Sequence, residues 1–151
     1  RDGLTPSAPA TAAYRQYLFN LVGGGRAGGP SGMAQSADDP AFDRFVRAQQ
    51  TWDRAFACNI ARALAERPIA LVVGIIGRGH LEYGHGTPYQ LRDLGISDVS
   101  VLLPSEADTQ DLGAVAGIAD AIFRLDRPEP PNSWRAKRPT PATAPAEGSR
   151  S

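Results

Sequence analysis

The sequence predicts an α/β fold in which a mostly parallel sheet is flanked by helices. One observation is a long amphipathic pattern over residues 42–64, which is typical of a helix covering a sheet. Another is the apolar run Ile69–Ile76, which is rich in β-branched residues and indicates a strand buried on both faces. Helix and strand patterns then alternate, as in other chains with parallel sheets. At 151 residues, the chain is long enough for one domain.

Residues 1–39 are expected to form a short helix and a glycine-rich loop. Apolar side chains recur at helical spacing over residues 14–21, and Thr11 precedes them as an N-cap. Residues 23–37 then contain six glycines and a proline, which is a loop composition. The alternative of a phosphate-binding loop lacks both a preceding strand and a Gly-Lys-Ser/Thr ending.

Asp39 and Pro40 predict the start of the long helix, as its N-cap and first-turn proline. Gln49 falls within the apolar stripe, where its amide either satisfies buried backbone groups or points into a site. Asp53 and Arg54 flank the stripe and are interpreted as a solvated side of the helix. The predicted core-facing residues are Phe42, Phe45, Trp52, Phe56, Ile60 and Leu64.

The later part of the chain repeats the alternation of helix and strand. Thr87 and Pro88 predict an N-cap and first residue for a short helix over Tyr89–Leu94. Apolar β-branched patterns predict strands over Ile96–Leu103 and Ile118–Leu125. Residues 40–128 are therefore expected to form one α/β unit.

The last residues, 129–151, are rich in proline, alanine and serine and predict a disordered tail. Lys plus Arg equals Asp plus Glu, at 16 each, so no net charge favours nucleic acid as a partner. The single cysteine, Cys58, excludes an internal disulfide. No apolar run approaches the roughly 20 residues of a transmembrane helix. Because the sequence begins at Arg1 without a leader, we expect a fragment or a processed chain.

The segment GRGHLEYGHG, residues 77–86, holds the only two histidines, His80 and His85. It follows the predicted buried strand and leads into a helix, and ligands of open α/β sheets bind at such strand ends. Together with Glu82 and Tyr83, the histidines offer imidazole, carboxylate and phenol groups. An ordinary glycine-rich turn, a general acid/base pair and a metal site all remain open on the residues alone.

Two motifs at this spacing resemble the second half of ChaN-like haem-binding uptake proteins of the Tiki superfamily. The helix sequence AQQTWDRAFACNIA resembles that family's A-Q-x-x-W/R-D-x-x-M-A pattern, with Phe56 in place of methionine. The sequence GRGHLEYGHGTPYQL resembles its G-x-x-H element followed by G-x-P-x-x-L. The matching residues are Gln49, Trp52 and Asp53 in the first motif and Gly77, His80, Gly86, Pro88 and Leu91 in the second.

The resemblance covers residues 40–125 and implies an incomplete domain. Members of the family carry an earlier strand that ends in G-E-x-H, and no such motif occurs in this sequence. The N-terminal half of the α/β domain is therefore expected to be missing, along with half of the composite site.

The resemblance further implies a haem-binding protein of iron uptake, not an enzyme, often a lipoprotein of the bacterial cell envelope. In such proteins, haem iron is held by tyrosine and histidine at a homodimer interface. Tyr83 is then the favoured axial ligand, because phenolate suits ferric haem. His80 or His85 would supply a second ligand or a hydrogen bond to the phenolate. Arg78 would pair with a haem propionate, and Gln49 and Asp53 would lie beside the site.

Two alternatives stand beside haem binding. Other members of the superfamily resemble metal-dependent hydrolases, and on that hypothesis His80 binds a divalent metal while Glu82 polarises water. The second alternative is a non-catalytic interaction module that binds neither haem nor metal.

Overall fold

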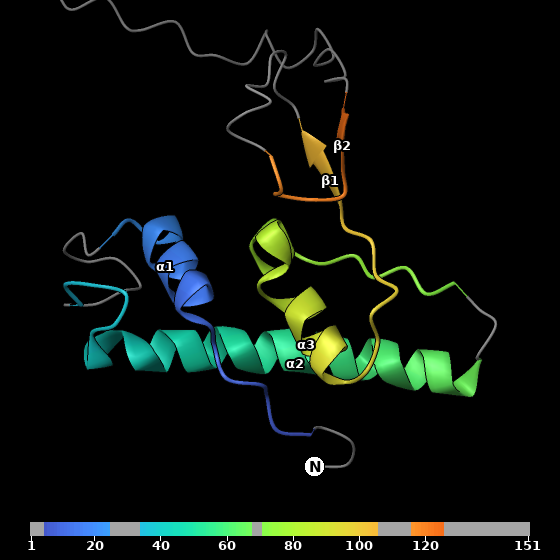
Figure 1. The fold of residues 1–151 in the computed structure, drawn as a ribbon, viewed down its shortest axis with the longest axis horizontal. Coiled ribbons are helices and arrows are strands. Elements are labelled where there is room, and N and C mark those ends of the chain that lie inside the picture. The colour runs from blue at the N-terminus through green and yellow to red at the C-terminus, as the bar shows by residue number, and fades with distance from the viewer. Residues whose placement is uncertain (1–4, 25–33, 68–70, 106–115, 126–151) are drawn as a thin grey trace, which may run out of the picture.

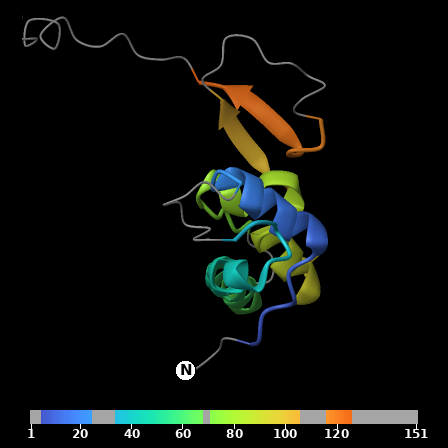
Figure 2. The same cartoon turned by 90° about the vertical axis from the view of Figure 1, so that its left-hand side faces the viewer.

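The computed structural model describes residues 5–24, 34–67, 71–105 and 116–125, and it has an α/β architecture (Figure 1). The long helix α2 lies on one side, α1 and α3 lie against it, and the two strands lie at the end away from α2 (Figures 1 and 2). The elements are α1 (Ala12–Leu21), the 3₁₀ turn η1 (Pro40–Phe42), α2 (Asp43–Glu66), the 3₁₀ turns η2 (Arg78–His80) and η3 (Glu82–Gly84), α3 (Thr87–Asp93), β1 (Leu102–Ser105) and β2 (Ala121–Arg124).

The predicted helix starts are confirmed for the first two helical segments. The Thr11 hydroxyl accepts a hydrogen bond from the Tyr14 amide at 3.1 Å and caps α1. The Asp39 carboxylate accepts one from the Ala41 amide at 2.9 Å and caps η1, which leads directly into α2. The main apolar cluster joins α1 to the start of α2 and includes part of the predicted glycine-rich loop: Tyr14, Leu18, Phe19, Ala34, Ala37, Phe42 and Val46.

The buried face of α2 differs from the predicted one. Asp53 and Arg54, expected to be solvated, are buried, whereas Trp52 is 59% exposed. The reason is that both charged side chains find polar partners on neighbouring elements, so burial does not leave them unsatisfied. The buried residues of α2 and its preceding turn are Phe42, Val46, Asp53, Arg54 and Ala57, while Phe45, Phe56, Ile60 and Leu64 are half-buried.

Helix α3 packs across the middle of α2 and begins two residues before the predicted range of Tyr89–Leu94. Thr87 is the first helical residue and Gly86 is the N-cap, so the predicted capping role of Thr87 is wrong. The Thr87 hydroxyl is turned towards α2 instead, where it donates to a carboxylate. Gly95 follows the helix with φ of +82°, as expected of a glycine at a helix end.

The two described strands form a parallel pair, with Leu102 opposite Ala121 and Ser105 opposite Arg124. The predicted third strand contains β2, but only the last part of the predicted second strand belongs to β1. A small apolar cluster stabilises this short pair; it joins Leu103 of β1 and the preceding Val101 to Ile118.

The prediction of a buried strand over Ile69–Ile76 is wrong for residues 71–76, and residues 69 and 70 lie outside the described part. This segment runs back along the C-terminal half of α2 (Figure 1), where a Cβ on Gly74 would lie 3.2 Å from the Ile60 side chain. None of the described backbone hydrogen bonds involves it. Its alternate side chains are open to solvent, with exposures of 89% at Leu71, 74% at Val73 and 95% at Ile75. An apolar pattern favours a strand, but a strand also needs a neighbour, and the described strands pair with each other.

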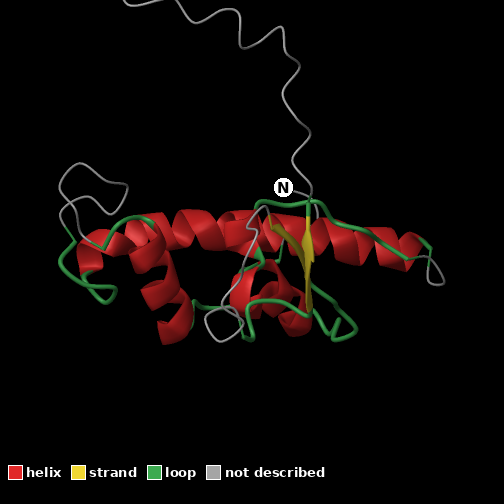
Figure 3. Cartoon of the chain, turned by 90° about the horizontal axis from the view of Figure 1, so that it is seen from above, coloured by secondary structure: helices red, strands yellow, loops and turns green. Residues whose placement is uncertain are grey.

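The predicted tail, residues 129–151, lies outside the described residues. Among the described helices, none is both long and apolar enough to cross a bilayer. Seen from above, α2 extends well past α3 towards its C-terminal end (Figure 3). His80 of the histidine segment contacts Asp53 and Phe56, in the middle of α2.

Candidate functional site

Asp53, in the middle of α2, organises the site. Its side chain is completely buried and accepts hydrogen bonds from three different elements. The Tyr14 hydroxyl of α1 donates at 2.5 Å, and the Thr87 hydroxyl of α3 donates at 3.1 Å. The third partner is Nδ1 of His80 in η2, at 2.9 Å. One carboxylate therefore ties the histidine segment to all three helices.

Gly86 makes this close approach possible. A Cβ at this position would lie 2.7 Å from Oδ1 of Asp53 and 2.6 Å from the carbonyl oxygen of His80. Real side chains do not tolerate such separations, so any other residue would push the start of α3 away from α2. The second glycine of the G-x-x-H…G pattern is thus required by the packing around the carboxylate.

His80 is fixed by two contacts and keeps one nitrogen available. Nδ1 is bound to Asp53, and the ring meets the Phe56 ring edge-on, with centroids 5.8 Å apart. The side chain is 21% exposed, and Nε2 has no hydrogen-bond partner among the described residues. A carboxylate behind a histidine is a common arrangement where the other ring nitrogen binds a metal.

Tyr83 and His85 lie in a second group, against α1. The Tyr83 ring is 5.8 Å from that of His85 and 5.9 Å from that of Tyr17. His85 also contacts Tyr14, at 6.3 Å between centroids. Partial burial lowers the pKa of His85, so its imidazole is neutral at pH 7. Within the described residues, no hydrogen bond or ring contact joins His80 to this group.

Tyr83 has the most unusual backbone of the segment. Its φ is +56°, the only positive value among the described non-glycine residues, and its amide donates to the carbonyl of Ile118 at 2.8 Å. Its side chain is 43% exposed, and its hydroxyl has no hydrogen-bond partner among the described residues. The turn therefore holds this phenol at the surface at some cost in backbone strain.

The other two tyrosines of the group have engaged hydroxyls. Burial, followed by the charge of Asp53, raises the pKa of Tyr14 far above its usual range. Burial and the hydrogen bond to Glu82 do the same to the pKa of Tyr17. Both phenols stay protonated and donate to carboxylates.

The divalent-metal hypothesis pairs Glu82 with His80, but the described partners of the Glu82 carboxylate are Tyr17 and Arg78. This carboxylate accepts a hydrogen bond from the Tyr17 hydroxyl at 2.7 Å and pairs with Arg78. In the part of the chain that the structure describes, no three His, Cys, Asp or Glu side chains gather as metal ligands do. Arg78, expected to meet a propionate, is half-exposed and bound to Glu82.

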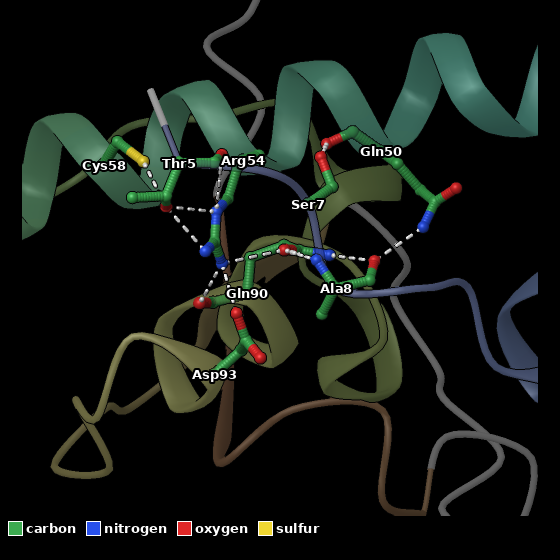
Figure 4. Close-up of polar contacts among 8 residues, drawn as sticks. All are labelled: Thr5, Ser7, Ala8, Gln50, Arg54, Cys58, Gln90 and Asp93. Carbon is green, nitrogen blue, oxygen red and sulfur yellow. Dashed lines mark hydrogen bonds and ion pairs between the residues drawn. The ribbon is translucent and has the colours of Figure 1, made fainter. Parts of the chain in front are cut away.

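Gln49 is half-buried and makes no side-chain hydrogen bond among the described residues. Its neighbour Gln50 instead donates to the carbonyl of Ala8 at 2.7 Å (Figure 4). The Gln49 amide therefore takes no part in the described hydrogen bonds and ring contacts of His80, Tyr83 and His85.

Arg54 forms a polar support behind the site (Figure 4). Its buried guanidinium donates to Asp93 of α3 at 2.6 Å and to the side chain of Gln90 at 3.1 Å. It also donates to the hydroxyl of Thr5 at 2.7 Å, so the N-terminal segment is tied to α2 and α3. This network holds α3 against α2, and with it the position of Gly86.

Sequence reasoning missed Tyr14, Tyr17 and Thr87 as site residues. The spacing of Tyr14 and Tyr17 indicated only a helix with an apolar face. Their hydroxyls were the available signal, because a buried tyrosine usually has a polar partner for its hydroxyl. Which partner it is depends on contacts between α1 and residues 39 to 65 positions away.

Comparison with known families identifies the family of this chain. Residues 1–91 match the family described as haem-binding uptake, Tiki superfamily, ChaN. The chain belongs to this family. The matched span includes α1 with Tyr14 and Tyr17, upstream of the region that carried the resemblance, and ends within α3. No curated protein and no solved structure matches the chain.

Proposed function

We propose that this member of the family binds haem at the surface of the histidine segment, with Tyr83 as the iron ligand. The observation that best supports this proposal is a difference among the hydroxyl groups of the three clustered tyrosines. The hydroxyls of Tyr14 and Tyr17 are committed to carboxylates, whereas that of Tyr83 is exposed and has no described partner. Ferric haem accepts tyrosine as an axial ligand.

The surroundings of Tyr83 fit a flat, largely apolar group. Its ring packs edge-on against Tyr17, and Leu21 of the same helix is 56% exposed. Leu21 also approaches the histidine segment, since a Cβ on Gly79 would lie 3.2 Å from its side chain. Exposed apolar surface beside polar donors is typical of a ligand site.

The two histidines take different parts in this proposal. His85 lies beside Tyr83 with a neutral imidazole and supplies a hydrogen bond to the phenolate. His80 offers Nε2 as a second donor to iron. Arg78 binds a propionate while keeping its ion pair with Glu82, because a guanidinium has donors for two carboxylates. Gln49 lies near this surface without a contact that supports a direct role.

The biological role that follows is haem uptake for iron at the bacterial cell envelope. Support comes from the family, whose description is haem-binding uptake. A homodimer in which two such surfaces share haem is part of the same proposal, and it rests on the family resemblance.

Titration of ferric haem into the purified chain tests the proposal. We expect a saturable Soret shift, and we expect Tyr83→Phe to abolish the tyrosinate-to-iron charge-transfer signature and to weaken binding at least tenfold. Tyr89→Phe is the matched control, because Tyr89 is a half-buried tyrosine on α3 outside the site. A wild-type chain without a saturable shift, or a Tyr83→Phe spectrum identical to wild type, contradicts the proposal.

A further inference from the structure

We propose that Asp53 is a positioning residue that keeps His80 in its Nδ1–H tautomer and presents the Nε2 lone pair to haem iron. The part that concerns iron rests on the proposed function, and the part that concerns the tautomer does not.

The partners of Asp53 are unusual because none of them is a permanent cation. Tyr14 and Thr87 are neutral hydroxyl donors, and His80 is the remaining partner. The adjacent Arg54 is bound to Asp93 and Thr5 instead. A buried carboxylate with neutral donors depends on each of them, because hydrogen bonds to charged groups are strong in a low-dielectric interior.

The tautomer of His80 follows from this environment. An ionised carboxylate only accepts hydrogen bonds, so the nitrogen at 2.9 Å must carry a proton. In a neutral ring, the other nitrogen, Nε2, then has the lone pair. The edge-on contact with Phe56 fixes the ring plane, so the direction of the lone pair is set as well.

Asp53 is itself held in place from two sides. Tyr14 donates to Oδ2, while Thr87 and His80 share Oδ1. The raised pKa of Tyr14 keeps that phenol a donor at all physiological pH values. A carboxylate fixed on both oxygens cannot rotate away from His80, which a surface carboxylate is free to do.

The expected consequence is a more basic and better oriented ligand. A carboxylate hydrogen-bonded to a metal-binding histidine raises the basicity of the ligand, and loss of such a partner typically costs about 10–100-fold in affinity. The same loss should change the ligand field at the iron, which a purely structural residue would not do.

The tautomer is tested first, in the absence of haem. The chain has only two histidines, so His85→Gln leaves a single imidazole for ¹⁵N NMR. We expect this ring to be protonated at Nδ1 when neutral, and to lose that preference in the double variant with Asp53→Ala. Asp98→Asn, at an exposed site outside the network, should leave it unchanged. A ring protonated at Nε2, or one that is the same with and without Asp53, overturns the inference.

Haem titration then tests the link to the ligand. Asp53→Asn can still accept a hydrogen bond from His80 but lacks the charge, so we expect affinity to fall about 10–100-fold with a shifted Soret band. Thr87→Val should shift both in the same direction to a smaller extent, and it serves as the readout if Asp53→Asn does not fold. If Tyr83→Phe and His80→Ala alter haem binding while Asp53→Asn and Thr87→Val do not, only this inference fails. If Tyr83→Phe has no effect, the proposed function fails, whatever the tautomer shows.

Discussion

Two tyrosine–carboxylate pairs lie side by side in this molecule and differ in how they are completed. Tyr14 and Tyr17, on one face of α1, stack with centroids 6.4 Å apart and donate to Asp53 and Glu82. Asp53 is fully buried and depends on neutral donors, whereas Glu82 also has the guanidinium of Arg78. The hydrogen bond from tyrosine to carboxylate therefore belongs to a fully buried network around Asp53 in one pair. In the other pair it joins a partly exposed ion pair between Glu82 and Arg78.

The largest effect is expected from Tyr14→Phe, which leaves one oxygen of Asp53 without a partner. A hydrogen bond to a buried charged group contributes about 1.5–3 kcal/mol to stability, and we expect a loss in that range. Urea denaturation followed by circular dichroism measures it, with Tyr89→Phe as the control. A loss below about 0.5 kcal/mol would show that Asp53 finds another donor and would remove the difference between the pairs.

A smaller loss is expected from Tyr17→Phe. Glu82 keeps Arg78 after this change, and its surroundings are wetter, so about 0.5–1.5 kcal/mol should be lost. The same denaturation experiment measures it. If Tyr17→Phe destabilises the chain as much as Tyr14→Phe, then burial does not distinguish the two pairs.

The smallest effect concerns His85, which packs against both tyrosine rings. Its pKa in the folded chain lies below the unfolded value of 6.5, because burial disfavours the charged ring. The unfolded chain therefore takes up the proton first, and stability falls as the pH drops below about 6.5. Wild-type denaturation midpoints should decline more steeply than those of His85→Gln over this range. Parallel curves would mean that the tyrosine rings do not desolvate His85.

Local signals predicted much of the fold. Thr11 and Asp39 identified the starts of the first two helical segments, and the apolar period predicted α2 almost to its ends. These features depend on neighbours within a few residues, which is why they can be read from a sequence. The charge pattern placed Asp53 on a solvated side of α2, which is wrong, because such a pattern takes no account of a buried charge that is satisfied by distant donors. The family resemblance, by contrast, implied that Asp53 lies beside the site, where it contacts His80.

The candidate site likewise combines features that the sequence predicted with features that it did not. His80, Tyr83 and His85 were singled out by composition and position, and the structure does bring Tyr83 and His85 together. It separates His80 from them and joins it to Asp53, 27 positions earlier. The apolar run that should have preceded the site as a strand lies unpaired along α2 over residues 71–76, because pairing requires a neighbour that no local pattern specifies.

The sequence by itself was enough to predict the helices, to single out the glycine-rich histidine segment and to indicate the family. Each of these depends on residue types at short spacing. Only the tertiary structure decided that Tyr14, Thr87 and His80 share one buried carboxylate. The physical reason is that burial of Asp53 costs free energy unless several donors converge on it, and those donors come from α1, η2 and α3. The packing of the helices brings these donors together and makes Nδ1 the nitrogen of His80 that is bound to Asp53.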